Sequence, residues 1–326
     1  MCWLVMRCHN LSPVESRGQG VYSSPMRKSC LLFILINLAA PLAGAQPGRF
    51  DTMTMAEKVS AGRSFHTTMA QPEAPFRILG NVYYVGASNI ASYLITTPDG
   101  HFLLDTGVSE MGPLIRANVE ALGFRLSDIR ILLSSHAHFD HVQGHAVMQR
   151  LTGAQVMALD ADADALATGM DLSPLGFEGW EPVRVDRRLA DGETITLGGI
   201  SMTPVWSPGH TPGCTNWLTT TRDGDRDYEL LFFGCNGPND GVRLLGNPNF
   251  PDLEAQAREG FATLKGLDPD IYLTGHPQAP FADVIDQLRV QVRPHPLLNQ
   301  VPWSQFINAA EAAFLRRLEE ERNGNR

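Results

Sequence analysis

The sequence has little positive charge, and after its first fifty residues it has no long hydrophobic run. Lys and Arg number 26 against 35 Asp and Glu, which gives a formal net charge of −9. A nucleic-acid partner would call for a basic face, so this charge balance argues against one. No later segment offers the roughly 20 apolar residues that a transmembrane helix needs. We therefore expect neither a nucleic-acid-binding protein nor, once the leader described next is removed, a membrane protein.

The first 45 residues have the layout of a secretory leader. Met26-Arg27-Lys28 is a short basic start, an apolar run follows from Cys30 to Ala40, and Ala43-Gly44-Ala45 supplies small residues before a cleavage point. This order is typical of a signal peptide, and the run is too short to anchor the chain in a bilayer. We predict translation from Met26, cleavage after Ala45 and export to the periplasm.

Cysteine is scarce in what remains. Removal of 45 residues from 326 leaves 281, and no repeat, linker or low-complexity block divides them. This length fits one domain, for which we expect a monomer. Cys214 and Cys235 are its two cysteines. An even pair in an oxidising compartment favours a disulfide, worth about 3 kcal/mol on the chain-entropy estimate. The alternative is a free cysteine that acts as a metal ligand or nucleophile.

Strand-like and helical patterns alternate in both halves of the chain. Ile129–Leu133 is an unbroken apolar run, as expected of a strand buried on both faces, and Leu253–Leu264 has helical spacing. This alternation favours sheets packed together with helices outside. The other predicted strands are Phe76–Leu79, Val82–Val85, Ser92–Thr97, His101–Leu104, Gln155–Ala158, Glu193–Leu197, Ser201–Val205, Cys214–Thr220, Glu229–Phe233 and Asp270–Leu273, and the other predicted helices are Pro113–Leu122, Val142–Leu151, Ala282–Val292 and Trp303–Arg322.

A cluster of histidines directly follows the first of these buried strands. The stretch Ser134-Ser135-His136-Ala137-His138-Phe139-Asp140-His141 holds three imidazoles and a carboxylate within six residues. Because side chains alternate along an extended segment, His136 and His138 are expected on one face. Asp140 and His141 would lie where the chain turns into the next helix. Such groups buried together without a partner would be costly, so we interpret the stretch as a metal site rather than as isolated structural histidines.

Two further histidines, His210 and His276, lie in turns that follow apolar strands. Beside the cluster, both become candidate ligands. Imidazoles with a carboxylate suit zinc, although ligand type alone leaves iron and manganese open. Six ligands exceed what one catalytic zinc uses, so we predict two ions with three protein ligands each.

These motifs resemble those of the metallo-β-lactamase superfamily, and those of its subclass B3 in particular. The H-x-H-x-D-H pattern is typical of the superfamily as a whole. The stretches that carry the resemblance occur in the expected order across nearly the whole mature chain: Ala74-Pro75-Phe76-Arg77-Ile78, Leu104-Asp105-Thr106-Gly107, His136-Ala137-His138-Phe139-Asp140-His141, Pro208-Gly209-His210-Thr211-Pro212-Gly213, Leu245-Gly246-Asn247-Pro248 and Gly275-His276-Pro277.

The resemblance implies that residues 46–326 form one αββα domain, two mixed sheets between layers of helices. Its implied zinc sites have these ligands: His136, His138 and His210 for the first ion, and Asp140, His141 and His276 for the second. Asp105 ends a strand beside the site and would orient a ligand or a loop. The alternative for Asp105 is a plain turn residue before Gly107.

The segment around Asn236 bears on the subclass. Members similar to glyoxalase II or to lactonases usually place a metal-bridging aspartate there, whereas no acidic residue follows until Asp240. By its spacing from Gly246-Asn247-Pro248, Asn236 matches a position that is commonly serine in subclass B3. Cys235 matches a neighbouring cysteine of many such enzymes, with Cys214 as its disulfide partner. The Asn236 amide can donate a hydrogen bond to metal-bound water or to a substrate carboxylate.

The resemblance thus implies a β-lactamase that confers resistance by opening the amide bond of penicillins, cephalosporins and carbapenems. A hydroxide held between the two zinc ions would attack the carbonyl, and Asp140 would hold metal and guide a proton. The expected partner is a small-molecule β-lactam, whose selection would depend on loops around Asp160–Trp180 and Gly237–Leu245. The alternatives are a hydrolase of the same fold that acts on a lactone or thioester, and a zinc-binding protein without catalysis.

Overall fold

The computed structural model describes residues 53–54, 56–58, 60, 66, 68–177, 179–235, 237–277 and 281–324. All of them lie within the compact unit Ala40–Arg326. The predicted leader, with its start at Met26 and its cleavage point after Ala45, lies outside the described residues, and so does Asn236. None of the described helices is both long enough and apolar enough to cross a membrane.

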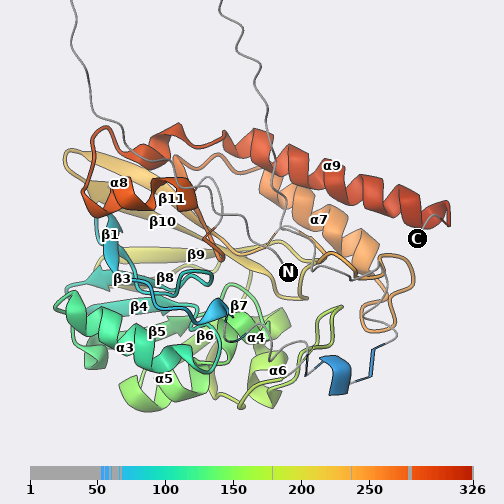
Figure 1. Ribbon diagram of the computed structural model, residues 1–326, viewed down its shortest axis with the longest axis horizontal. Helices are drawn as coiled ribbons and strands as arrows, with labels where there is room; N and C mark the ends of the chain where they lie inside the picture. The colour runs from blue at the N-terminus through green and yellow to red at the C-terminus, as the bar shows by residue number, and fades with distance from the viewer. Residues whose placement is uncertain are drawn as a thin grey trace, which may run out of the picture. The chain divides into compact units, whose positions relative to one another are not determined.

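The strands form a seven-stranded sheet and a five-stranded sheet (Figure 1). In the first sheet the strands follow chain order, antiparallel from β1 to β4 and parallel from β4 to β7. In the second the order is β12-β11-β10-β9-β8, and only β11 and β12 are parallel within it. The bounds are β1 Phe76–Leu79, β2 Val82–Tyr84, β3 Tyr93–Thr97, β4 Gly100–Leu104, β5 Ile129–Leu133, β6 Gln155–Leu159, β7 Val185–Leu189, β8 Ile195–Leu197, β9 Ile200–Trp206, β10 Thr215–Asp223, β11 Arg226–Phe233 and β12 Ile271–Thr274.

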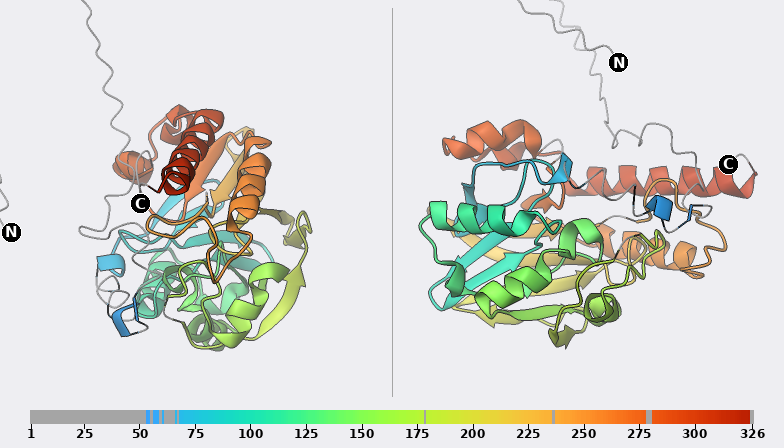
Figure 2. Two further views of the ribbon diagram at one scale, coloured as in Figure 1. Left: turned by 90° about the vertical axis from the view of Figure 1, so that its right-hand side faces the viewer. Right: turned by 60° about the horizontal axis from the view of Figure 1, so that its bottom comes forward.

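Helices cover the outer faces of both sheets. In Figures 1 and 2, α7 and α9 lie against the sheet that contains β10 and β11, and α3 and α5 lie against the sheet that contains β4 and β5. This arrangement is the predicted αββα architecture. The helices are α3 Met111–Ala121, α4 Phe139–Val142, α5 His145–Thr152, α6 Asp160–Thr168, α7 Leu253–Lys265, α8 Ile285–Arg289 and α9 Trp303–Arg322, with short 3₁₀ turns at Leu126–Asp128, Ala282–Val284 and Pro296–Asn299.

The alternation of side chains along the central strands explains why four layers form. On β5, Ile131 and Leu133 join the apolar core between the sheets, while Leu132 joins the core beneath the helices. On β11, Phe232 and Leu231 divide in the same way. Each such side chain, when fully buried, stabilises the fold by about 1.5–3 kcal/mol. Since both faces of these strands are apolar, each sheet needs a second sheet on one side and helices on the other.

Two elements differ from the expectations drawn from sequence. The sequence predicts no strand at β7, because the three central residues of β7 are exposed and give no apolar alternation. The sequence predicts a loop around Asp160–Trp180, which is wrong for the first nine residues, since they form α6. Alanine and aspartate alternate there without a clear apolar face, and the helix ends at Gly169, whose φ of 72° suits glycine.

The helix predicted at Ala282–Val292 is shorter than expected and interrupted. A 3₁₀ turn precedes α8, which ends at Arg289. Gln291 then adopts a left-handed φ of 52°, and its amide nitrogen donates hydrogen bonds to the carbonyl oxygens of Leu288 and Arg77. These local bonds compete with continuation of the helix.

Candidate metal centre

The predicted ligands gather where strand ends of the two sheets meet. His136 and His138 follow β5 of the seven-stranded sheet, whereas His210 lies between β9 and β10 and His276 follows β12, all in the five-stranded sheet. Backbone hydrogen bonds join the two groups of loops: Thr215 N–H donates to Ser135 O at 2.7 Å, and Ala91 N–H to Gly275 O at 2.9 Å. Ligands from distant parts of the sequence are thereby held at one edge.

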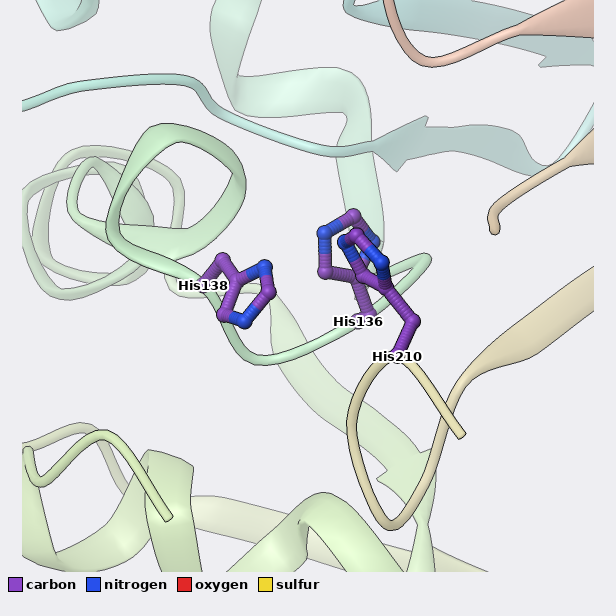
Figure 3. Close-up of side chains that lie close together, drawn as sticks. All are labelled: His136, His138 and His210. Atoms are coloured by element: carbon purple, nitrogen blue, oxygen red, sulfur yellow. The ribbon is translucent and has the colours of Figure 1, made fainter. Parts of the chain in front are cut away.

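Three histidines form the first cluster (Figure 3). The ring centroid of His136 lies 4.8 Å from that of His138 and 4.6 Å from that of His210. The centroids of His138 and His210 are also 4.6 Å apart. One nitrogen of each ring lies within 4.8 Å of the others. His136 and His138 are buried and His210 is partly buried, so the three nitrogens lie close together and largely away from solvent.

Asp140, His141 and His276 form the second cluster. Asp140 Oδ2 lies 3.7 Å from His141 Nε2 and 3.5 Å from His276 Nε2. The approach of His276 depends on Gly275, where a Cβ atom would lie 3.0 Å from Cε1 of His141. The two clusters adjoin each other, because the rings of His136 and His141 have centroids 4.0 Å apart.

Asp105 is connected to a ligand of each cluster by hydrogen bonds. Its Oδ2 accepts hydrogen bonds from His141 Nδ1 at 2.9 Å and from the Ser135 hydroxyl at 2.7 Å, and its Oδ1 accepts one from Ser135 N–H at 2.7 Å. The Ser135 oxygen in turn accepts from His136 Nδ1 at 3.0 Å. Asp105 adopts a left-handed φ of 58°, which is uncommon for a residue other than glycine and persists where the surroundings hold it. These contacts match the orienting role rather than that of a plain turn residue.

Two other predicted ligands also have Nδ1 occupied by an acceptor. His210 Nδ1 donates to Gly237 O at 2.9 Å, and His276 Nδ1 donates to Asn89 O at 3.1 Å. A carbonyl oxygen can only accept, so the proton lies on Nδ1 and the lone pair of Nε2 is left for a metal ion. The same orientation follows for His141 from its bond to the Asp105 carboxylate.

The donor atoms fit a bound metal ion. Within the described part of the chain, Nε2 of His138 and Nε2 of His141 are buried without a hydrogen-bond partner. An unsatisfied buried polar atom costs about 1–3 kcal/mol, which a metal ion would offset. Burial and the neighbouring imidazoles lower the pKa of His138 to about 4 and the pKa of His210 to about 3. At neutral pH both rings are therefore uncharged, the form that binds a metal.

Three buried polar residues near the ligands were not among the predicted site residues: Ser135, His145 and Asp162. His145 begins α5, its Nδ1 lies 2.7 Å from the Thr106 hydroxyl, and it belongs to neither cluster. Ser135 stands within the histidine motif, so its position could have indicated its role. Asp162 lies on the helix that was not predicted, and no feature of the sequence separates it from its neighbours Asp160 and Asp164.

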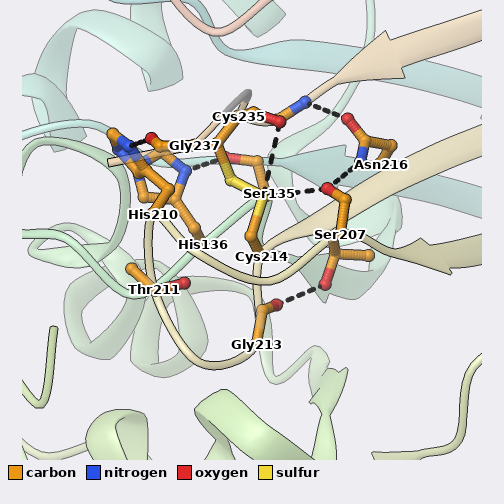
Figure 4. Close-up of a disulfide and its surroundings, with 12 residues drawn as sticks. Ser135, His136, Ser207, His210, Thr211, Gly213, Cys214, Asn216, Cys235 and Gly237 are labelled. Atoms are coloured by element: carbon orange, nitrogen blue, oxygen red, sulfur yellow. Dashed lines mark hydrogen bonds between the residues drawn. A yellow bond between two sulfur atoms is a disulfide. The ribbon is translucent and has the colours of Figure 1, made fainter. Parts of the chain in front are cut away.

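Cys214 and Cys235 pair in the structure, with Cα atoms 6.2 Å apart (Figure 4). Cys214 immediately precedes β10 and Cys235 lies just beyond β11, so the pair closes the open end of this hairpin. It fastens the loop of His210 to the segment that carries Gly237, the carbonyl partner of His210. Neither cysteine belongs to a candidate metal cluster of the described residues, which favours the disulfide over the free-cysteine alternative.

The fold has well-matched neighbours among solved structures. The FEZ-1 metallo-β-lactamase from Legionella gormanii gives a TM-score of 0.74 at 32% identity, covering 78% of this chain and 98% of that chain. BJP-1, a subclass B3 metallo-β-lactamase of Bradyrhizobium japonicum, gives a TM-score of 0.70 at 31% identity, covering 80% of this chain and 100% of that chain.

Curated relatives match a shorter part of the chain. The hydroxyacylglutathione hydrolase of Acidiphilium cryptum (strain JF-5) is 31% identical over 159 residues, which is 48% of this chain and 53% of that protein. The chain spans about half the length of the curated relatives it matches. The family model of the metallo-β-lactamase superfamily matches residues 85–276, which include every member of both ligand clusters. With its fold, its two clusters and this match in agreement, the chain belongs to the metallo-β-lactamase superfamily.

Proposed function

We propose that this protein hydrolyses the amide bond of β-lactams in a reaction that depends on two zinc ions. The observation that carries this proposal is the extent of the structural similarity. It covers 98% of FEZ-1 and 100% of BJP-1, whereas the sequence similarity to the hydroxyacylglutathione hydrolase of Acidiphilium cryptum covers 53% of that protein. We further propose a monomer that is exported to the periplasm and acts on small molecules, without a nucleic-acid or membrane partner.

The carboxylate content of the site also supports a β-lactam substrate. Asp140 is the one acidic residue in the two clusters of the described chain. The next acidic residue after β11 is Asp240, whose side chain is 73% exposed and pairs with Arg317 at 3.3 Å. Asp240 therefore does not take the bridging position that the resemblance assigns to an aspartate in relatives of glyoxalase II.

Each residue of the clusters has a part in the proposed reaction. His136, His138 and His210 would hold one zinc ion, and Asp140, His141 and His276 the other. Bound zinc would polarise the lactam carbonyl and supply a nucleophile at neutral pH by lowering the pKa of a water molecule.

The protein side chains would direct the proton and orient the substrate. The Asp140 carboxylate would take up the proton released as water attacks the carbonyl carbon, and return it to the lactam nitrogen as the C–N bond breaks. The Asn236 amide would donate a hydrogen bond to the carboxylate of the substrate. The bonds that Asp105 and Gly237 make to His141 and His210 hold these rings before the substrate arrives, so reorganisation during the reaction is small.

Thioester hydrolysis is the second candidate, because the curated relatives include hydroxyacylglutathione hydrolases. The test is to measure, with purified zinc-loaded protein, the hydrolysis of a carbapenem, a cephalosporin, a lactone and a hydroxyacylglutathione. We expect opening of the β-lactam rings that a chelator abolishes.

The variant His136→Ala should also abolish turnover while its circular dichroism stays unchanged, and Asp164→Asn, a surface change, should leave the rate unaltered. Fast thioester turnover without β-lactam turnover would replace the proposal by the second candidate. Zinc binding without turnover of any ester or amide would identify a binding protein.

A further inference from the structure

Asp162 is a buried carboxylate whose hydrogen-bond donors, within the described residues, all belong to the loops of the first cluster. It is 2% exposed, and among the described residues no Lys or Arg forms an ion pair with it. Its Oδ2 accepts hydrogen bonds from Ala137 N–H at 2.8 Å and from the Thr211 hydroxyl at 2.8 Å, and its Oδ1 accepts one from Gly213 N–H at 2.7 Å. Burial raises the pKa of Asp162 to about 6 against the effect of these three bonds, so the group is a carboxylate at neutral pH.

These three donors flank the predicted ligands of one ion. Ala137 stands between His136 and His138, and Thr211 directly follows His210. The first loop follows β5 in the seven-stranded sheet, and the second joins β9 to β10 in the five-stranded sheet. A single carboxylate therefore connects the two loops whose histidines must converge.

The glycine at position 213 shows how close this connection is. A Cβ atom there would lie 2.4 Å from the backbone nitrogen of Asp162 and 2.6 Å from its Cβ, so no side chain fits between loop and helix. α6 is itself fixed, because Ala163 and Leu166 are fully buried and Trp180 N–H donates to Gly169 O just beyond the helix. The carboxylate thus extends from a rigid support.

We propose that Asp162 is a positioning residue that sets the separation of the His136–His138 segment and the His210 loop, and so the zinc affinity of the three-histidine cluster. This inference rests on the proposed metal site, but not on the identity of the substrate. In the described part of the chain, the hydrogen bonds of Asp162 go to Ala137, Thr211 and Gly213 and not to a ligand side chain. Asp162 acts through the backbone that carries the ligands, in the way that groups behind a metal site orient its ligands.

The requirement for a carboxylate follows from the donors. All three partners donate, and an ionised carboxylate offers acceptors alone. Asp162→Asn keeps the size of the side chain but turns an NH₂ group toward the N–H of either Ala137 or Gly213, so at least one bond is lost. Asp162→Ala removes all three bonds. Thr211→Val removes only the hydroxyl bond, and Thr211→Ser retains it.

The test is zinc binding by the purified protein in competition with a chromophoric chelator, together with the absorption spectrum of the cobalt-substituted protein. Effects on zinc affinity from groups behind the ligands are typically about 10- to 100-fold, which we expect at one of two sites in Asp162→Asn. The second site and the circular dichroism should stay unchanged. Asp164→Asn is the matched control, since this aspartate of the same helix pairs with Arg188 at the surface.

Thr211→Val keeps the test decisive if Asp162→Asn fails to fold. We expect about a 2- to 10-fold loss of zinc affinity, as for one hydrogen bond, and recovery in Thr211→Ser. Wild-type zinc affinity in Asp162→Asn, or equal affinities for Thr211→Val and Thr211→Ser, would overturn the role of Asp162. Zinc binding that depends on Asp162 in a protein that opens no β-lactam would uphold this inference and overturn the proposed substrate. A wild-type protein that binds no zinc would overturn both.

Discussion

At the scale of the residue, side chains that hydrogen-bond to the ligands fix the orientation of the imidazole rings. Asp105 accepts from His141 directly and from His136 by way of the Ser135 hydroxyl. One carboxylate therefore fixes a ring in each cluster. The rings of His136 and His141 are also the point where the two clusters adjoin. A substitution at Ser135 should therefore affect metal binding although it replaces no ligand.

Replacement of Ser135 by alanine tests this connection. The variant Ser135→Ala loses the bond to His136 Nδ1 but keeps the backbone bond from residue 135 to Asp105 Oδ1. We expect a zinc affinity about 10-fold lower, because the ring of His136 is no longer held in one orientation. Competition with a chelator measures it. Ser134→Ala is the control, as this serine is equally buried but its hydroxyl has no hydrogen bond to Asp105 or His136 in the described chain. Equal losses in the two variants would contradict the connection.

His145 should make the stability of the protein depend on pH. Burial lowers the pKa of His145 from 6.5 to about 4. Between these values the unfolded chain binds a proton that the folded chain does not, so the free energy of unfolding falls as the pH falls. One such group contributes up to about 1.4 kcal/mol per pH unit. Urea unfolding of metal-free protein at several pH values from 7 to 4 gives the free energy of unfolding as a function of pH. In His145→Gln this free energy should fall less steeply with falling pH, by the amount given above. Equal pH dependence in the two proteins would mean that folding does not lower the pKa of His145.

The sequence predicts the ligands better than the groups that orient them. Three histidines and an aspartate in six residues after a buried strand are hard to explain without a metal, and His210 and His276 lie in similar turns. The structure brings all six together. Asp162 could not be predicted in this way. It matters because its carboxylate is buried against two loops, and burial of one aspartate among three on a helix depends on tertiary packing.

At the scale of the element, α9 fixes a loop beside the site. Arg317 donates to the carbonyl oxygens of Pro238 and Asn239 at 2.8 and 2.7 Å. One turn further along the helix, Glu321 accepts from the backbone N–H groups of Leu244–Leu245 at 2.9 and 2.8 Å. Both ends of the loop are therefore held by charged side chains of one helix. Bonds of this kind to charged groups contribute about 1.5–3 kcal/mol.

Loss of this attachment should loosen the loop before it unfolds the protein. In Arg317→Ala we expect faster amide hydrogen exchange between Gly237 and Gly246, because the two bonds that hold the Pro238–Asn239 end of this segment are lost. His210 donates to Gly237 O, so zinc affinity should also fall a few-fold. Hydrogen exchange followed by mass spectrometry measures the first effect. Arg316→Ala, a change at the exposed neighbouring position, should alter neither exchange nor affinity. Unchanged exchange in Arg317→Ala would show that the loop is held by other contacts.

Elements were predictable where their burial leaves a pattern in the sequence. β5 and β11 contribute to two cores and are continuous apolar runs. β7 lies at the edge of its sheet with exposed arginines, so its backbone pairing with β6 is the feature that makes it a strand. Backbone pairing leaves no mark on residue choice at such an edge. The break in the predicted Val142–Leu151 helix near Gly144 also has no pattern in the sequence. A Cβ atom at Gly144 would lie 2.6 Å from Thr106 O, a contact between segments far apart in the chain.

At the scale of the whole molecule, each candidate metal site joins the two sheets. The first cluster combines His136 and His138 from the loop after β5 with His210 from the five-stranded sheet. The second combines Asp140 and His141 with His276, which follows β12. Separation of the sheets would therefore disrupt both clusters at once. Metal binding and the packing of the two sheets are expected to be coupled, since the clusters exist only in the folded chain.

This coupling predicts that zinc stabilises the protein against unfolding. A ligand that binds only the folded state at 1,000 times its Kd contributes about 4 kcal/mol, which for a chain of this size raises the Tm by on the order of 10 °C. Differential scanning calorimetry with zinc and with a chelator measures the shift. His276→Ala removes the ligand that the five-stranded sheet gives to the second cluster, so the shift should shrink by the share of that site. His101→Gln, at the far end of β4 from Asp105, should keep the full shift. An equal Tm with zinc and with chelator would show that the clusters bind no metal tightly in the folded protein. Equal shifts in His276→Ala and the wild type would instead exclude His276 as a ligand.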